Sequence, residues 1–320
     1  MKNWFKKLFA GMGIGVGAAI PGVSGAAIAV IFKIYESIIW AVNNVRKQFK
    51  RAVAILLPVL LGIVIAVIPC IILFDKALES FVFGTVCAFA GFLIGSLPSV
   101  KDEIKGEKIT RNCKISFVIG VIFVLLLGVA SIFLGKAINI DAAFSRMDLW
   151  VYFVLLPVGI AAAVALTVPG LSGSLILLIV GFYKPLLKYT VLWAKMMFSG
   201  DFSTTGQLFL MLFIFAIGVL IGVVLVSKIM KVLLAKYRVV TYSAILGFII
   251  GSIAVLFYNY SVFIYYEAWA GKVIEEVSPA LKPYVEIPLG IVILIVAAAL
   301  SYLLVRLSRK SKQQEEIPQA

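Results

Sequence analysis

Two copies of a Pro-Gly-x-Ser-Gly motif contain the residues of this chain best suited to hold an anion. The first copy is Pro21-Gly22-Val23-Ser24-Gly25, and the second is Pro169-Gly170-Leu171-Ser172-Gly173. Pro followed by Gly interrupts a helix, so a new helix whose first amides lack carbonyl partners is expected after each motif. These amides, the positive end of the helix dipole and a serine hydroxyl together favour a phosphate or a carboxylate.

The same residues also permit a purely structural interpretation, in which the glycines allow close helix packing and the serine caps its own helix. One motif alone supports both interpretations equally, but two copies in corresponding positions favour binding. We therefore predict a phosphate site formed by eight residues, namely Gly22, Val23, Ser24, Gly25, Gly170, Leu171, Ser172 and Gly173.

Polar residues near the motifs are candidates for headgroup contact or for coupling. They are Lys33, Tyr35, Glu36, Tyr183 and Arg146, and the two tyrosines share the 148-residue offset of the motifs. An interfacial aromatic belt, a snorkelling lysine and a weak surface ion pair explain them equally well. The acidic candidates for proton coupling are Asp75, Glu79, Asp141 and Asp148, and all lie near predicted membrane ends rather than deep inside.

Composition assigns the chain to the integral membrane proteins. Of its 320 residues 63% are hydrophobic and 14% are charged, which lies far outside the range of soluble domains. The net charge of +14 comes from basic residues between apolar runs, which favours anionic lipids as partners over nucleic acid.

Several reaction classes lack their residues in this sequence. There is no histidine to act as a base or metal ligand, the three cysteines have no metal or disulfide spacing, and no Gly-x-x-x-x-Gly-Lys-Ser/Thr loop occurs. We therefore expect neither an enzyme nor a metal or cofactor site.

Eight apolar runs must position these residues. Six approach the roughly 20 residues that a spanning helix needs; they are Ala52–Phe74, Ser80–Leu97, Ile115–Gly135, Leu208–Ser227, Tyr242–Tyr258 and Ile287–Leu307. The other two, Leu8–Phe32 and Leu149–Phe182, contain the motifs.

The first motif-bearing run is predicted to be a re-entrant hairpin. Its arms, Leu8–Ile20 and Pro21–Phe32, would be about 20 Å and about 18 Å long as helices, too short to cross a core of about 30 Å. In the second run, Leu149–Val168 is long enough to cross alone unless Pro157 bends it, so both a hairpin arm and a full span stay open.

The distribution of charge favours hairpins in both runs. With a cytoplasmic N-terminus and two hairpins, 21 of the 29 Lys and Arg residues fall on the cytoplasmic side, as the positive-inside rule requires. The C-terminus is then cytoplasmic too.

The two halves of the chain resemble each other beyond the motifs. Gly91–Ser96 matches Gly247–Ser252, and Gly62 matches Gly218, at an offset of 156. The eight additional residues of the second half are expected in the polar stretch Ser199–Gly206. Each half then comprises a hairpin and three crossings, so the second half is inverted, and inverted repeats bind substrate near the midplane. We predict an all-α membrane protein with repeats at 1–140 and 141–310 and a polar tail at 311–320.

The doubled motif, with Tyr35-Glu36 after the first copy and Tyr183 after the second, resembles the PopT-type polyprenyl-phosphate transporters of bacteria over about residues 8–260. This resemblance implies that undecaprenyl phosphate, the lipid carrier of wall synthesis, is returned across the plasma membrane for reuse. Two departures from the family are Gly25-Ala26-Ala27 in place of Gly-Gly-Thr, and Lys33 where the family commonly has glycine.

Two other functions remain open on the residues alone. A transporter of a small water-soluble anion would use the same motifs but close its cavity to lipid. A membrane scaffold or enzyme subunit would need neither motif for binding. The energy source, net direction, prenyl chain length and oligomeric state are not encoded in any recognisable pattern.

Overall fold

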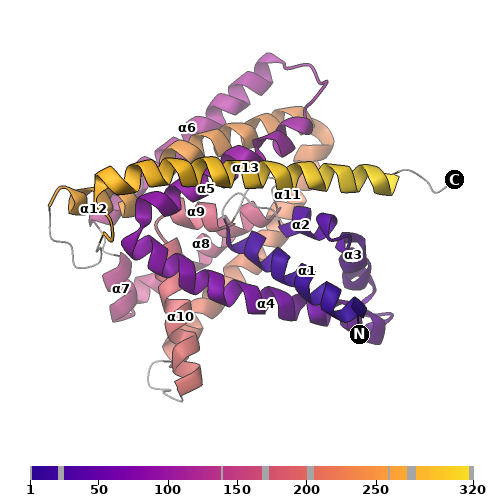
Figure 1. The fold of residues 1–320 in the computed structure, drawn as a ribbon, viewed down its shortest axis with the longest axis horizontal. Helices are drawn as coiled ribbons and strands as arrows, with labels where there is room; N and C mark the ends of the chain where they lie inside the picture. Colours follow the sequence, from indigo (N-terminus) through magenta and orange to yellow (C-terminus); the bar gives the residue numbers. More distant parts are fainter. Residues whose placement is uncertain are drawn as a thin grey trace.

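The structure is a computed structural model that describes residues 2–20, 25–137, 140–167, 173–199, 205–258, 260–271 and 279–316. Helices and turns make up this part of the chain, and it contains no strand. The helices are α1 (Lys2–Ala19), α2 (Gly25–Ile31), α3 (Tyr35–Asn44), α4 (Phe49–Ser80), α5 (Val82–Asp102), α6 (Arg111–Ala137), α7 (Ile140–Arg146), α8 (Leu149–Thr167), α9 (Gly173–Ile179), α10 (Tyr183–Ser199), α11 (Thr205–Leu256), α12 (Tyr260–Trp269) and α13 (Pro283–Glu316) (Figure 1).

Six candidate membrane-spanning segments lie within the described residues, and they coincide with the six predicted runs. They are Phe49–Leu78, Val82–Asp102, Arg111–Phe133, Thr205–Lys236, Arg238–Leu256 and Pro283–Arg309. Two of them belong to α11, which is broken at Tyr237 by a non-helical φ of −134°. The prediction of an all-α integral membrane protein is confirmed at this level.

Two helix pairs lie at the motif-bearing ends of the chain halves. Helix α1 packs along α4, and α8 packs along the first segment of α11; α1 and α4 run side by side in Figure 1. Glycine permits both approaches, because a Cβ on Gly11 would lie 2.2 Å from the Val59 carbonyl oxygen, and one on Gly159 would lie 2.4 Å from that of Phe215.

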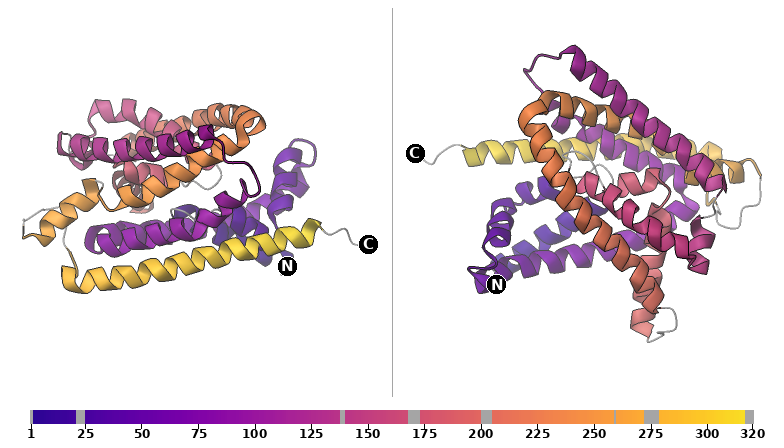
Figure 2. Two further views of the ribbon diagram at one scale, coloured as in Figure 1. Left: turned by 90° about the horizontal axis from the view of Figure 1, so that it is seen from above. Right: turned by 180° about the vertical axis from the view of Figure 1, so that it is seen from behind.

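Two further pairs join elements that are distant in sequence. Helix α5 packs along α13, and α6 packs along the second segment of α11, as the view from above in Figure 2 shows for α5 and α13. A Cβ on Gly91 would lie 2.3 Å from the Leu294 carbonyl oxygen, and one on Gly247 would lie 2.0 Å from that of Phe117. Close backbone contact therefore holds both long-range pairs together.

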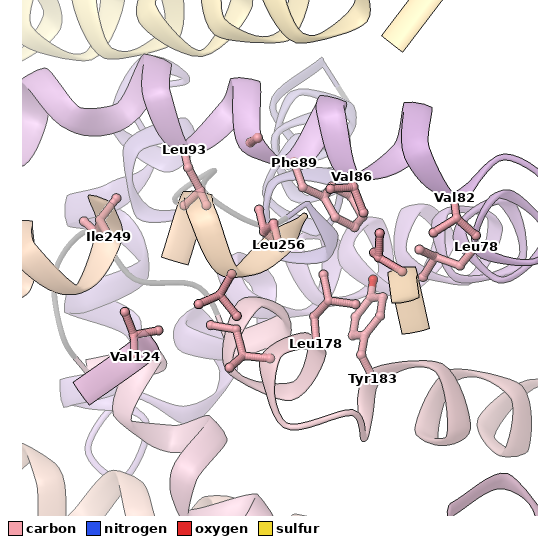
Figure 3. Packing of buried hydrophobic residues seen from close by; sticks show 14 of the residues in the cluster. Leu78, Val82, Val86, Phe89, Leu93, Val124, Leu178, Tyr183, Ile249 and Leu256 are labelled. Atoms are coloured by element: carbon pink, nitrogen blue, oxygen red, sulfur yellow. The ribbon is translucent and has the colours of Figure 1, made fainter. Parts of the chain in front are cut away.

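The largest buried cluster lies where α4, α5, α6, α9, α10, α11 and α12 meet (Figure 3). Among the spanning segments α5 is the most enclosed, and its buried positions follow both faces of the helix. The lipid-facing segments are exposed and apolar, as in the first part of α11. Helix α5 therefore forms the centre of the protein.

Two details add to the sequence analysis, and a third corrects it. Helix α8 continues through Pro157, because neighbouring groups can satisfy the backbone carbonyl that proline leaves without a donor in a membrane helix. The region between the last two spans contains α12, whose aromatic side chains pack on α5. Helix α10 has 17 residues against 10 in α3, so most of the additional length of the second half lies in a helix rather than in the polar stretch after it.

Candidate functional site

Each Pro-Gly-x-Ser-Gly motif falls between two separate helices. Helix α1 ends at Ala19 and α2 begins at Gly25, while α8 ends at Thr167 and α9 begins at Gly173. Residues 21–24 and 168–172, which include both serines, lie outside the described residues. The last glycine of each motif is thus the first residue of a new helix, and the phosphate contacts of the motif stay a prediction.

The two helices before and after the first motif fold back on each other. A Cβ on Gly13 of α1 would lie 3.0 Å from the ring of Phe32 and 3.1 Å from the side chain of Ile28. Helices α8 and α9 are likewise in contact. Both motifs therefore connect a pair of packed helices.

The two short helices end in the same way. Lys33 and Gly181 have left-handed φ values of 56° and 81°. The Ile34 amide donates to the Ala29 carbonyl at 3.0 Å, and the Phe182 amide donates to the Leu177 carbonyl at 2.9 Å. Together with the Lys33–Val30 and Gly181–Leu178 bonds of 2.9 Å and 3.2 Å, these are two Schellman caps. A lysine thus stands at a position whose backbone favours glycine.

The two equivalent tyrosines lie in different surroundings. Tyr35 is 41% exposed, and its neighbours Lys33 and Glu36 are exposed as well. Tyr183 is only 8% exposed and belongs to the central cluster, where it lies near Leu78 and Val82 (Figure 3). A shared role for the pair is therefore not supported by their burial.

The remaining predicted polar residues lie near the surface or outside the described side chains. Arg146 Nη2 forms an ion pair with Asp148 Oδ2 at 3.3 Å, and the two side chains are 69% and 31% exposed. The side chains of Asp75, Glu79 and Asp141 are not among those described. Arg146 thus has an acidic partner, and its role in headgroup contact stays a prediction.

Glu286 is the one acidic residue buried within the described part of the chain, and the sequence did not reveal it. It is 0% exposed. Its Oε1 accepts from the Gly84 amide at 3.2 Å, and its Oε2 lies 2.5 Å from the Tyr265 hydroxyl. An acidic residue in the first turn of a helix is common, so its position in the sequence gave no signal.

Tyr265 belongs to a group of aromatic residues on α12. The ring centroid of Trp269 lies 5.1 Å from that of Tyr265 and 5.7 Å from that of Tyr266. Burial raises the pKa of Tyr265, and the hydrogen bond to Glu286 adds to that shift. Burial also raises the pKa of Tyr266 to about 12, with smaller contributions from Cys87 and Glu286. Both hydroxyls therefore keep their protons at neutral pH.

Metal ligands do not gather in this region, since no group of three His, Cys, Asp or Glu side chains forms among the described residues. Among the described residues, the polar groups around Glu286 are tyrosine hydroxyls, a backbone amide and its own carboxyl group. These can bind anions and hold protons.

Comparison with known proteins gives a consistent result. A family described as undecaprenyl phosphate translocase-like matches residues 14–273. A polyprenyl-phosphate transporter of Staphylococcus aureus is 27% identical over 255 residues, which cover 77% of this chain and 84% of that protein. A polyprenyl-phosphate transporter of Vibrio cholerae is 26% identical over 265 residues, which cover 78% of this chain and 77% of that protein. No solved structure matches.

Proposed function

Because this chain belongs to the undecaprenyl phosphate translocase-like family, we propose that it is a translocase that returns undecaprenyl phosphate across the bacterial plasma membrane. The lipid carrier would thereby be reused in cell-wall polymer synthesis. Relatives that are named polyprenyl-phosphate transporters support this substrate class. Those names describe carriers, so no chemical step on the lipid is proposed.

The observation that carries this proposal is the pair of helix starts at Gly25 and Gly173. A phosphate needs several donors in a place that water does not fill, and the first amides of a helix have no carbonyl partners of their own. The serine and glycine residues of each motif would add hydroxyls and close backbone approach. The prenyl chain needs no polar partner and can stay in lipid.

Inverted repeats would place the two motifs on opposite sides of one central site. Repeat-equivalent contacts support this arrangement, since α1 pairs with α4 as α8 pairs with the first part of α11. The long-range pairs α5–α13 and α6–α11 correspond in the same way. We assign the repeats to 1–140 and 141–310, followed by a tail at 311–320, with both termini cytoplasmic.

Helix length supports a re-entrant course for the motif regions. Helices α2 and α9 have seven residues each, about 10 Å at 1.5 Å per residue, against a hydrocarbon core of about 30 Å. Each would lead from a motif near the middle of the membrane toward the side where its partner helix begins. Alternating exposure of the motifs would then move the headgroup, and basic residues at the membrane surface would attract anionic lipids.

The test is the double substitution of Ser24→Ala and Ser172→Ala, assayed as transport of a labelled polyprenyl phosphate in proteoliposomes. Loss of one donor to a charged group costs roughly 1.5–3 kcal/mol, so transport at low substrate should fall at least tenfold. The matched control is Ser99→Ala with Ser199→Ala, because both hydroxyls bond to carbonyls of their own helices.

Undiminished transport by the motif double variant would refute the assignment of the site. A photoreactive polyprenyl phosphate should label residues near 21–35 and 169–183. Failure to label them, combined with uptake of a small soluble anion, would identify a transporter of soluble anions instead.

A further inference from the structure

We propose that Glu286 is the proton-binding group that couples lipid-phosphate transport to a pH difference across the membrane. This inference rests on the proposed transport function and adds to it an energy source and a residue. It concerns a carboxyl group outside the motifs and outside residues 14–273, the part matched by the family.

The first support is the closed surroundings of the carboxyl group. Glu286 is 0% exposed, and three elements contribute its polar neighbours. These are the Gly84 amide of α5, the Tyr265 hydroxyl of α12 and, through that hydroxyl, the Ser80 carbonyl at the end of α4. A buried carboxyl group inside a membrane transporter is costly and is typical of proton relays.

The second support is the number of hydrogens available. The Tyr265 hydroxyl lies 2.5 Å from Glu286 Oε2 and 3.1 Å from the Ser80 carbonyl oxygen, yet it has one hydrogen to donate. With Glu286 ionised, Tyr265 donates to the carboxylate, and the Ser80 carbonyl still accepts a hydrogen bond of 2.8 Å from the Ala280 amide. With Glu286 protonated, its O–H donates to Tyr265, and Tyr265 donates to Ser80.

Both protonation states therefore leave every one of these groups hydrogen-bonded. The Gly84 amide donates to Oε1 in either state. A group that is satisfied both with and without its proton can exchange that proton without an unpaired buried intermediate. The exchange itself breaks the O–H bond of the carboxyl and passes the proton to water.

The third support is the balance of charge around Glu286. The titratable groups that interact with it from α5 and α12 are Cys87, Tyr265 and Tyr266, and Lys282 and Tyr284 precede it in the chain by four and two residues. No Lys or Arg in the described part of the chain forms an ion pair with it. Glu286 thus has no fixed cation as a partner among the described residues, and it lies at the amide ends of both α5 and α13.

The fourth support is a short route to the surface. Glu286 lies in the first turn of α13, and its neighbours Tyr284 and Val285 are 73% and 43% exposed. A proton thus crosses about one helical turn, roughly 5 Å. In the proposed orientation this end of α13 faces the outside of the cell.

The fifth support is that Tyr265 and the second motif-bearing region share one buried cluster. Tyr265 belongs to the same buried cluster as Val82, Leu178 and Tyr183. Figure 3 shows the Tyr183 ring next to Leu178, with Leu78 and Val82 to the upper right of its hydroxyl. Leu178 lies on α9, which begins at Gly173, so a change in the Tyr265 hydrogen bonds can be transmitted to the helix that starts at the motif.

The experiment measures accumulation of a labelled polyprenyl phosphate by proteoliposomes with a clamped membrane potential and an imposed pH difference. One coupled proton supports about a tenfold accumulation per pH unit. The wild-type protein should approach this ratio in one direction of the gradient. Glu286→Gln keeps an acceptor for the Gly84 amide but cannot release a proton, so its accumulation ratio should fall to about 1.

Two further variants separate coupling from structure. Tyr265→Phe removes the donor to the ionised carboxylate, so the pH of half-maximal stimulation should move upward. Tyr266→Phe removes a hydroxyl of the same helix that no hydrogen bond joins to Glu286 in the described structure, so its pH profile should match the wild type. An infrared band of a protonated carboxyl group that changes on lipid-phosphate binding should be present in the wild type and absent from Glu286→Gln.

The outcomes distinguish this inference from the function on which it rests. Wild-type liposomes that move no polyprenyl phosphate refute the proposed function. A wild type that transports but ignores the gradient, or a Glu286→Gln protein that accumulates lipid like the wild type, overturns the coupling role alone. So does a Glu286→Gln protein whose thermal stability and transport fall together while the gradient still stimulates it, because that pattern identifies a structural cap.

Discussion

Replacing Lys33 by glycine should stabilise this protein, although it removes a residue predicted to contact the lipid headgroup. Lys33 has a left-handed φ of 56° at the end of α2, and its side chain is exposed. A left-handed conformation costs an L-residue roughly 1–2 kcal/mol. Glycine avoids that cost but loses about 0.4–1 kcal/mol through the larger entropy of its unfolded chain. The net gain in the free energy of unfolding is therefore about 0.5–1 kcal/mol.

Gly181 provides the reciprocal test, because it has a φ of 81° at the equivalent position after α9. Gly181→Ala should lower stability by about 0.5–1 kcal/mol through the same two terms with opposite signs. The assay is thermal unfolding of the purified protein in a fixed detergent, where 1 kcal/mol corresponds to about 2 °C for a chain of this size.

Lys114→Gly is the matched control. Lys114 is also an exposed lysine, but it lies in the first turns of α6 with helical geometry. Glycine there should cost up to about 1 kcal/mol. If Lys33→Gly lowered the melting temperature as Lys114→Gly does, strain at Lys33 would not be a property of the protein in solution. A stabilised Lys33→Gly protein with weaker lipid-phosphate uptake would indicate that the lysine is retained for its charge.

Three further predictions concern packing, charge and alkaline pH. Gly62→Ala should destabilise the protein by about 1–3 kcal/mol in thermal unfolding, since the added Cβ would lie 2.1 Å from the Leu8 carbonyl oxygen, whereas Gly206→Ala, with nothing within 4 Å, should not. Arg238→Ala removes an exposed 2.8 Å ion pair with Glu103 and should lower the melting temperature only slightly, a loss that vanishes in high salt; a large loss that persists in high salt would contradict this prediction. Because burial raises the pKa of Tyr266 from about 10 to about 12, the native state holds this proton more tightly than the unfolded chain. The contribution of Tyr266 to the free energy of unfolding is therefore complete below pH 10 and is lost between pH 10 and 12. If the free energy of unfolding of Tyr266→Phe fell with pH as steeply as that of the wild type in this range, this contribution would be ruled out.

Local patterns were sufficient for much of this molecule. Long apolar runs located the six spanning segments, because a membrane-crossing helix satisfies its own backbone and needs only length and apolarity. Pro-Gly likewise located the helix ends near Ala19 and Thr167. Even the correspondence of Lys33 and Gly181 follows from one repeat offset, and the structure gives both the same left-handed cap.

The burial of individual side chains could not be predicted from local sequence patterns. Tyr35 and Tyr183 occupy equivalent sequence positions, yet one is 41% exposed and the other 8%, because different helices cover the two sites. Glu286 looked like an ordinary residue of a first helical turn, and only the approach of α5 and α12 enclosed it. Neither distinction is visible from neighbours in the chain.

The sequence by itself thus determined the class of protein, the approximate positions of the six candidate spanning segments among the described residues and the two interrupted helices, because each depends on interactions within about 20 consecutive residues. Tertiary structure alone decided which helices pair, as in α5 with α13, and which polar groups lose contact with water. Those outcomes depend on backbone approach between segments some 200 residues apart, such as Gly91 and Leu294, and no local pattern specifies which surfaces will meet.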